Sequence, residues 1–374
     1  MFFYIVFMVL GSLSFVEIFS KKTKLHKAIE VIVVAFTTAV SSLRCGPTGD
    51  YEAYKLVFLE TNINDRLLHA ITVRNTHATE VGYNLLNFVS KSIINDFRFF
   101  IFVEALLVNV LLYIVIKKIL FDKAVYECDY CITVYWIAWS LGLYNIIVVR
   151  QTLAVLICWY SLKYIKEKNI AKFILATILA FSIHRISIVW IVAYWIYWKK
   201  TRTTYGKVIF LSELFICSLV GIGTLDIVAS GMSGMLGEKA RHYLNLGVAS
   251  YGENYNVVFI LAKSIVNTVF LLVVFLYIYN RFQTDAQFCG MFNLYALGCA
   301  ISLASCFISN EFARAGTCFS MLSIFLMTYI FRIKASIENR IICFGTLGMY
   351  ILLRFYVYLH GQPELYLLEN IMGW

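Results

Sequence analysis

Charged residues are scarce in this sequence, and their scarcity excludes an ordinary soluble domain. Asp, Glu, Lys and Arg make up 14% of the 374 residues, whereas 61% are hydrophobic. In a soluble globular domain about a quarter of the residues are charged. An excess of apolar residues on this scale is typical of a polytopic membrane protein, so we expect an all-α chain that crosses a bilayer many times.

Proline is also scarce, and the common motifs of nucleotide-binding proteins and hydrolases are absent. Only two prolines occur, Pro47 and Pro363, so the paired broken helices of many secondary transporters are not evident. The sequence has no Walker A loop, no H-E-x-x-H and no G-x-S-x-G. These absences disfavour an ATP-driven pump and a hydrolase. The ten cysteines are scattered, mostly within apolar runs, and do not form a disulfide framework.

Apolar runs divide the chain into about twelve expected membrane spans. We place them at residues 2–20, 28–43, 98–116, 130–148, 150–165, 170–185, 186–198, 208–224, 257–279, 288–308 and 315–331, with a last span after the basic segment 332–340. Two longer polar segments, 44–97 and 225–256, are expected as larger loops. We treat residues 1–374 as a single transmembrane domain.

The distribution of basic residues predicts the orientation of the chain. Most of the 32 Lys and Arg residues lie in one set of short loops, which the positive-inside rule places in the cytoplasm. Both large loops and both termini then face outward, where the cations are mostly arginines. Arginine binds phosphate oxygens with a planar fork of donors, so this arrangement suits a phosphate or pyrophosphate ligand. No basic stripe with interleaved aromatics indicates nucleic acid.

The segment 145–187 is predicted to form a hairpin of two apolar helices joined by a lysine-rich tip. Arg150 and Gln151 begin its first helix, and His184 and Arg185 end its second. Each arginine lies about 26 Å from the tip along a helix, so the hairpin brings these side chains to one membrane face and predicts an anion site. The alternative for Arg150 is an interfacial arginine that extends to water. His184 is a candidate general base or orienting donor, and the alternative is an interfacial histidine that is only hydrogen-bonded.

The first polar segment begins with the turn R-C-G-P-T-G-D-Y, which contains Arg44, Asp50 and Tyr51 and is followed by Tyr54. Glycine and proline force the turn, and tyrosines beside a carboxylate are typical of a sugar-binding surface. The alternative is an ordinary turn in which Asp50 caps the next helix.

Two further arginines are candidates for the anion site. Arg314 begins a late span, beside Glu311, which either orients it or forms a structural salt bridge. Arg241 lies in the second polar segment next to His242 and Tyr243. Three acids of the first segment are interpreted as solvated loop residues: Asp65, Glu80 and Asp96.

These motifs together resemble the EpsG family of Wzy-type polysaccharide polymerases. The matching positions are Arg44 with the Asp50-Tyr51…Tyr54 turn, Arg150-Gln151 before a small-residue helix, His184-Arg185-Ile-Ser187, Arg314, and Pro363 with Tyr366. Gly49 directly precedes Asp50, where the family more often has an intervening residue. Arg185 stands where lysine is commoner, and it retains the charge.

The resemblance implies a GT-C-like integral membrane glycosyltransferase with its active site on the outer side of a bacterial cytoplasmic membrane. Such enzymes move a growing glycan from undecaprenyl pyrophosphate onto the non-reducing end of the next lipid-linked oligosaccharide repeat. The resemblance implies no nucleotide sugar, no cofactor and no metal. Membrane lipid, a chain-length regulator and a flippase are the candidate partners, and nucleic acid is not.

We assign roles to the candidate residues as a hypothesis. Arg150, Arg185 and Arg314 bind the pyrophosphate, and Arg150 also acts in catalysis by stabilising the leaving group. Asp50 or His184 activates the acceptor hydroxyl. The remaining substrate-binding candidates are Arg44, Tyr51, Tyr54, Gln151 and Arg241. The alternative functions are an O-antigen ligase-like transferase, which uses another acceptor, and a lipid-linked oligosaccharide flippase or transporter.

Overall fold

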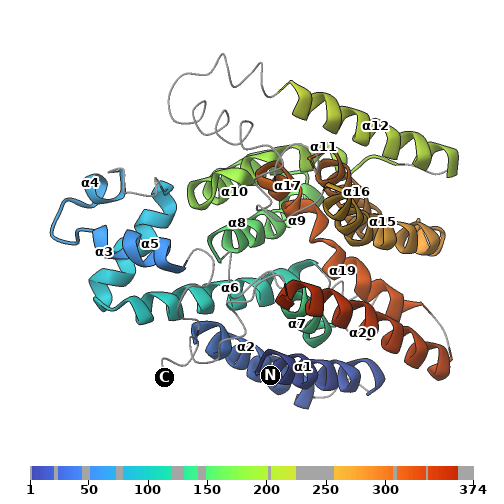
Figure 1. Cartoon of the computed structure of the whole chain (residues 1–374), viewed down its shortest axis with the longest axis horizontal. Helices are drawn as coiled ribbons and strands as arrows, with labels where there is room; N and C mark the ends of the chain where they lie inside the picture. Colours follow the sequence, from blue (N-terminus) through green and yellow to red (C-terminus); the bar gives the residue numbers. More distant parts are fainter. Residues whose placement is uncertain are drawn as a thin grey trace. The chain divides into compact units, whose positions relative to one another are not determined.

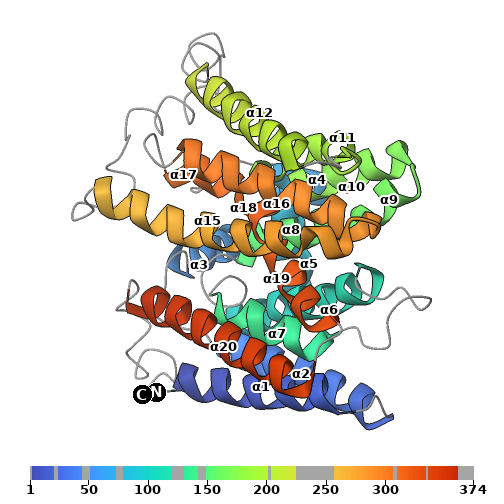
Figure 2. The same cartoon turned by 90° about the vertical axis from the view of Figure 1, so that its right-hand side faces the viewer.

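The structure is a computed structural model, and it describes residues 2–20, 24–43, 51–72, 79–119, 130–141, 149–200, 204–224, 257–305, 310–333 and 336–360. Within these ranges the chain is helical and contains no strand, which confirms the all-α prediction. The chain divides into two compact units, Met1–Ile188 with Phe331–Trp374, and Val189–Ile330. Figures 1 and 2 show the helices of both units.

The first unit contains eleven of the described α-helices. They are α1 (Phe2–Phe19), α2 (Lys24–Ser42), α3 (Tyr51–Glu60), α4 (Leu67–Thr72), α5 (Val81–Ile93), α6 (Phe97–Ile119), α7 (Cys131–Ser140), α8 (Val149–Tyr160), α9 (Leu162–Lys166), α10 (Ile170–Ile183) and α20 (Ile337–His360). The second unit contains α11 (Ala193–Ile196), α12 (Thr204–Gly223), α15 (Val257–Phe282), α16 (Ala286–Ser305), α17 (Asn310–Ala315), α18 (Thr317–Ser320) and α19 (Ser323–Thr328). Two 3-10 helices, η1 (Arg185–Val192) and η3 (Tyr329–Arg332), lie where the chain passes between the units.

Four helical stretches in the described part of the chain are long and apolar enough to cross a membrane: Phe97–Ile119, Ala286–Ser305, Ala313–Arg332 and Ile337–Val357. Shorter apolar helices occupy other expected spans, among them Phe3–Phe19, Cys131–Ser140 and Ile170–Ile183. The expected number of about twelve spans stays a prediction. The first expected loop, 44–97, contains the helices α3, α4 and α5, whereas the second, 225–256, lies outside the described residues.

Helix α7 forms the centre of the first unit and is buried along its whole length. A helix that is apolar on every side is stable only when other helices surround it, and α1, α2, α6 and α20 all pack against α7 (Figure 2). Its N-terminus receives the buried carboxylate of Glu17 from α1. Glu17 accepts hydrogen bonds from the backbone N–H of Ile132 (3.0 Å) and from the N–H and hydroxyl of Thr133 (2.8 Å each).

The outer faces of several helices expose large apolar side chains. On α10, for example, Leu175 is 68% exposed, and Ile178 and Leu179 are each 55% exposed. On α20, Ile342 and Leu353 are similarly exposed. Contiguous apolar faces of this kind are costly in water and are expected where a helix contacts lipid.

Glycines allow the closest helix contacts of the second unit. A Cβ atom on Gly298 of α16 would lie 2.3 Å from the backbone N of Ser320 and 2.9 Å from the carbonyl O of Gly316. A Cβ atom on Gly316 would in turn lie 2.9 Å from the carbonyl O of Gly298. Small residues at such crossings let helix backbones approach each other in membrane proteins.

We predict that Gly298→Ala destabilises the protein by about 1–3 kcal/mol, because the added methyl group overlaps backbone atoms that cannot rotate away. Thermal unfolding in detergent micelles measures the change. The matched control is Gly221→Ala in α12, where a Cβ atom would meet nothing within 4 Å. The control is expected to be neutral or stabilising by up to about 1 kcal/mol, because alanine favours the helix. Equal unfolding temperatures for the two variants would contradict the prediction.

Candidate functional site

The predicted hairpin is present in the described residues 149–187. Helix α8 leads into the short helix α9, and the chain reverses at Lys168, which has a positive φ of 54°. Asn169 then caps α10, because its side-chain oxygen accepts a hydrogen bond from the backbone N–H of Lys172 at 3.0 Å. Helices α8 and α10 pack against each other. The hairpin therefore brings its two ends together, as the sequence predicts.

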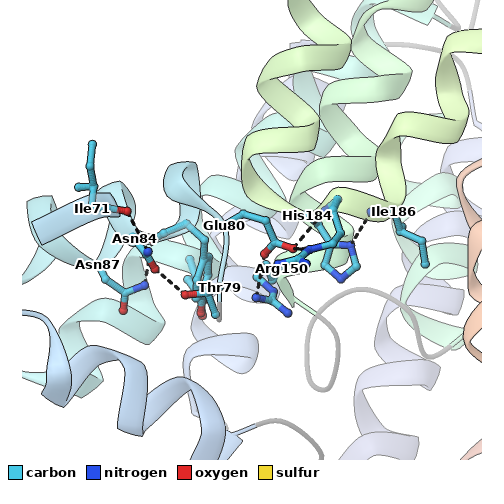
Figure 3. A network of polar contacts seen from close by, with 11 residues as sticks. Ile71, Thr79, Glu80, Asn84, Asn87, Arg150, His184 and Ile186 are labelled. Carbon is cyan, nitrogen blue, oxygen red and sulfur yellow. Dashed lines mark hydrogen bonds and ion pairs between the residues drawn. The ribbon is translucent and has the colours of Figure 1, made fainter. Parts of the chain in front are cut away.

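Arg150 and Arg185 meet at a single carboxylate, that of Glu80. Arg150 donates from Nη1 to Oε2 of Glu80 at 3.0 Å, and Arg185 donates from Nε to Oε1 at 2.7 Å. The backbone N–H of Arg185 also donates to Oε1, at 3.3 Å. Figure 3 shows the carboxylate pointing toward Arg150, with His184 beside it.

The interpretation of Glu80 as a solvated loop residue is wrong. Its side chain is 10% exposed, and the side chains of Arg150 and Arg185 are 19% and 25% exposed. A buried carboxylate is stable only with close charged or hydrogen-bonding partners, and both arginines supply them. The three side chains form the candidate site, which we call the Glu80 cluster.

A glycine brings Glu80 to the end of the hairpin. Gly82, two residues further along in α5, faces Ser182 of α10. A Cβ atom at Gly82 would lie 2.4 Å from Oγ of Ser182 and 2.8 Å from its carbonyl O. Helix α5 can therefore approach α10 so closely only because residue 82 has no side chain.

The segment before α5 is held by hydrogen bonds on its other side. Thr79 donates from its hydroxyl to the side-chain oxygen of Asn84, and Asn84 donates to the carbonyl O of Ile71 at 3.0 Å (Figure 3). These bonds join the end of α4 to the start of α5. Glu80, between Thr79 and α5, is thus fixed from both directions.

The charge of Glu80 is set by opposing effects. Burial raises the pKa of its carboxyl, but the charge of Arg150 and the hydrogen bond and charge of Arg185 lower it more. The pKa of Glu80 therefore lies below its ordinary value of 4.5. Glu80 is ionised near neutral pH, and the cluster of two arginines and one carboxylate keeps one positive charge in excess.

Two tyrosine rings lie against the guanidinium group of Arg150. Its guanidinium carbon lies 5.9 Å from the ring centre of Tyr54 and 5.4 Å from that of Tyr83. Both distances are within the range of cation–π attraction. Tyr83 is itself fixed, because its hydroxyl donates to Oε1 of the buried Glu104 at 2.9 Å. Arg150 is therefore oriented by a carboxylate and by two aromatic faces.

Helices α3 and α5 are joined by a lysine at the far end of α5. Lys91 donates from Nζ to the carbonyl oxygens of Phe58, Leu59 and Thr61, at 2.9, 3.0 and 2.7 Å. These carbonyls lie at the C-terminus of α3, where a cation is favourable. The expected first loop is thus a packed helical segment, and its residues Tyr54 and Tyr83 share a core with Phe100 of α6.

His184 ends α10 next to the Glu80 cluster. Its backbone N–H donates to the carbonyl O of Ala180, and its ring Nδ1 accepts from the backbone N–H of Ile186 at 3.4 Å. A neutral ring that accepts at Nδ1 carries its proton on Nε2. This contact favours a histidine that donates a hydrogen bond over one that accepts a proton.

Three other predicted residues that the structure describes, Gln151, Tyr51 and Tyr54, are buried. Gln151 lies in α8 with 5% of its surface exposed, and Tyr51 of α3 packs its ring on that of Phe97 at 5.3 Å. Tyr54 is 3% exposed and contacts Arg150 through its ring face. The tyrosine rings thus pack within the protein, and their role in sugar binding stays a prediction.

The remaining predicted residues are not placed at the cluster. Arg44, Asp50 and Arg241 lie outside the described residues. Arg314 belongs to α17, in the unit formed by Val189–Ile330, whereas the Glu80 cluster belongs to the other unit. The structure therefore brings together Arg150, Arg185, His184 and Tyr54, and it adds Glu80, which sequence reasoning missed.

One local signal could have identified Glu80. It directly precedes the amphipathic run V-G-Y-N-L-L-N-F-V, with a glycine two positions later. An acid at the start of such a helix, next to a small residue that permits close packing, is a candidate for a contact with another helix.

The described chain is an all-helical membrane protein with an arginine pair closed on a buried carboxylate. Residues 27–369 match the EpsG family. The chain belongs to the EpsG family, which connects it with polysaccharide biosynthesis and with glycosyltransferase-like polymerases. No curated protein and no solved structure matches the chain.

We predict that Glu80→Gln lowers the free energy of unfolding by about 2 kcal/mol near neutral pH, because it removes the charge from the three hydrogen bonds that the carboxylate accepts. Since the pKa of Glu80 is lower in the folded than in the unfolded chain, its stabilisation is complete above pH 4.5 and is lost as the pH falls through the folded pKa. The difference between wild type and variant should therefore shrink in acid. Chemical unfolding at pH 7 and in mild acid measures it, and a constant difference would contradict the prediction.

Proposed function

We propose that this chain is a polysaccharide polymerase of the outer face of the bacterial cytoplasmic membrane. It transfers a growing glycan from undecaprenyl pyrophosphate onto the non-reducing end of a lipid-linked oligosaccharide repeat. The observation that supports this proposal most directly is the convergence of Arg150 and Arg185, from the two ends of one hairpin, on the anionic side chain of Glu80. Family membership supports the same class of reaction.

The reaction requires stabilisation of a leaving anion. The acceptor hydroxyl oxygen attacks the anomeric carbon, the bond from that carbon to the pyrophosphate oxygen breaks, and the lipid pyrophosphate leaves with the electron pair. Negative charge on the pyrophosphate therefore grows in the transition state. Guanidinium groups that are already oriented in a partly dry site stabilise such charge without reorganising. The rings of Tyr54 and Tyr83 hold the guanidinium of Arg150 in this way.

A base must accept the proton of the acceptor hydroxyl, and the candidates are His184 and Asp50. The hydrogen bond that His184 accepts at Nδ1 decides between them in this proposal. Since Nδ1 of His184 accepts from the backbone N–H of Ile186, we assign His184 as a donor to a pyrophosphate oxygen through Nε2–H. Asp50 then remains the candidate for the general base. In this proposal Arg44, Arg241 and Arg314 stay candidate substrate-binding residues, and Gln151, Tyr51 and Tyr54 hold the Glu80 cluster in shape.

The alternative functions differ in their products. An O-antigen ligase-like transferase moves the glycan once, to an acceptor other than the lipid-linked repeat. A flippase moves the lipid-linked repeat between leaflets and forms no new glycosidic bond. Purified protein with a defined lipid-pyrophosphate-linked repeat therefore distinguishes the three, because only a polymerase produces a ladder of products that differ by one repeat.

We predict that Arg150→Ala reduces the rate of ladder formation by about 10²–10³-fold, because one preorganised donor to the leaving pyrophosphate is lost. Products are separated by length after timed reactions with the cognate repeat. The control is Arg66→Ala, which removes the same charge from an exposed position at the start of α4, and it should retain the wild-type rate. The proposal fails if the cognate repeat gives no ladder, or if Arg150→Ala gives the wild-type ladder.

A further inference from the structure

The carboxylate of Glu80 fills the position that the proposed function gives to the substrate's pyrophosphate. Both of its oxygens are in use, one by Arg150 and the other by Arg185. An anionic ligand that binds this arginine pair with the same donors must therefore replace Glu80. Glu80 therefore competes, from within the protein, with any anion that binds Arg150 and Arg185.

We propose that Glu80 is a specificity-determining residue, whose carboxylate excludes singly charged phospholipid headgroups from the arginine pair and is displaced by the doubly charged pyrophosphate of the lipid-linked donor. This inference rests on the proposed function of the Glu80 cluster. It concerns selection between two kinds of lipid, which the reaction alone does not specify.

The selection follows from charge and from the attachment of Glu80 to the chain. Two arginines without an acid would attract every anionic headgroup of a membrane, and such lipids are far more abundant than the donor. A singly charged phosphodiester has no charge advantage over a carboxylate, and the carboxylate is held nearby at an effective concentration of about millimolar or more. A pyrophosphate diester brings twice the charge and can contact both arginines. Specificity through a built-in competitor is a form of discrimination against the wrong ligand.

The displaced carboxylate has an alternative position close by. Glu80 is the residue before α5, its backbone is extended (φ −79°, ψ 153°), and its side chain makes no capping hydrogen bond to its own helix. The N-terminus of a helix favours a carboxylate. A rotation of the Glu80 side chain from the arginines toward the start of the 13-residue α5 therefore keeps its charge in a favourable place.

A simpler role for Glu80 is to hold the two arginines in position for the substrate. The two roles predict opposite effects on affinity. If Glu80 competes with the ligand, removing its charge strengthens anion binding. If Glu80 only orients the arginines, removing its charge weakens anion binding.

The experiment measures binding of a prenyl pyrophosphate that carries one sugar to full-length protein in nanodiscs. The discs contain phosphatidylcholine with increasing fractions of phosphatidylglycerol, which is the singly charged competitor. Wild type should bind the probe with a dissociation constant that phosphatidylglycerol barely changes. Glu80→Gln should bind it about tenfold more tightly in phosphatidylcholine, and should lose this affinity as phosphatidylglycerol increases.

Two further variants complete the design. Glu80→Asp keeps the charge but shortens the side chain, so the competitor is weaker and probe affinity should lie between those of wild type and Glu80→Gln. The control Glu52→Gln removes one charge from an exposed position of α3, and it should behave as wild type. Because Glu80→Asp retains a carboxylate, it tests the sign of the effect even where Glu80→Gln does not fold.

The outcomes separate this inference from the proposed function. Weaker probe binding by Glu80→Asp and Glu80→Gln, or a wild-type response to phosphatidylglycerol in Glu80→Gln, overturns the role of Glu80 and leaves the proposed function intact. Absence of probe binding in wild type and in every Glu80 variant overturns both.

Discussion

The sharing of one largely buried carboxylate between two arginines is the interaction on which the arrangement of the candidate site depends. Glu80 precedes α5, Arg150 lies in the first turn of α8 and Arg185 begins η1 after α10, so a single side chain joins three segments of the chain. Burying these charges costs free energy. The cost is offset by three hydrogen bonds to the carboxylate and by the rings of Tyr54 and Tyr83 against Arg150. The contact also makes the helices of the first polar segment part of the site.

The close approach of helices at glycines makes this arrangement possible. Gly82 brings the start of α5 against Ser182, and this places the preceding Glu80 beside Arg185. In the other unit, Gly298 and Gly316 serve a crossing between α16 and the helices that follow it. At both of these crossings, residues without a side chain let the helix backbones approach each other. This is expected where lipid provides no hydrophobic force to press helices together.

Much of the fold and part of the site could be predicted from the sequence. The hairpin was predictable because its apolar runs are long and Arg150 and Arg185 are almost equally distant from its tip. The family was predictable from short motifs around Arg150, His184 and Arg185. Glu80 was not, because it lies 70 residues before Arg150 in a polar segment, where acids are usually solvated. The helices α3 to α5 were not predicted either, because a short, half-polar helix that packs on its neighbours lacks the long apolar run that identifies a membrane span.

The cap that Glu17 places on α7 has a consequence for how the chain is assembled during synthesis. The ribosome delivers α1 before α7, so the carboxylate enters the bilayer more than a hundred residues ahead of the N–H groups that it will accept from. Until α7 is in place, Glu17 lacks the three hydrogen-bond donors that Ile132 and Thr133 supply in the folded chain, and the N-terminus of α7 lacks its carboxylate cap. This makes the pairing of α1 with α7 a cooperative step, in which neither helix reaches its final environment without the other.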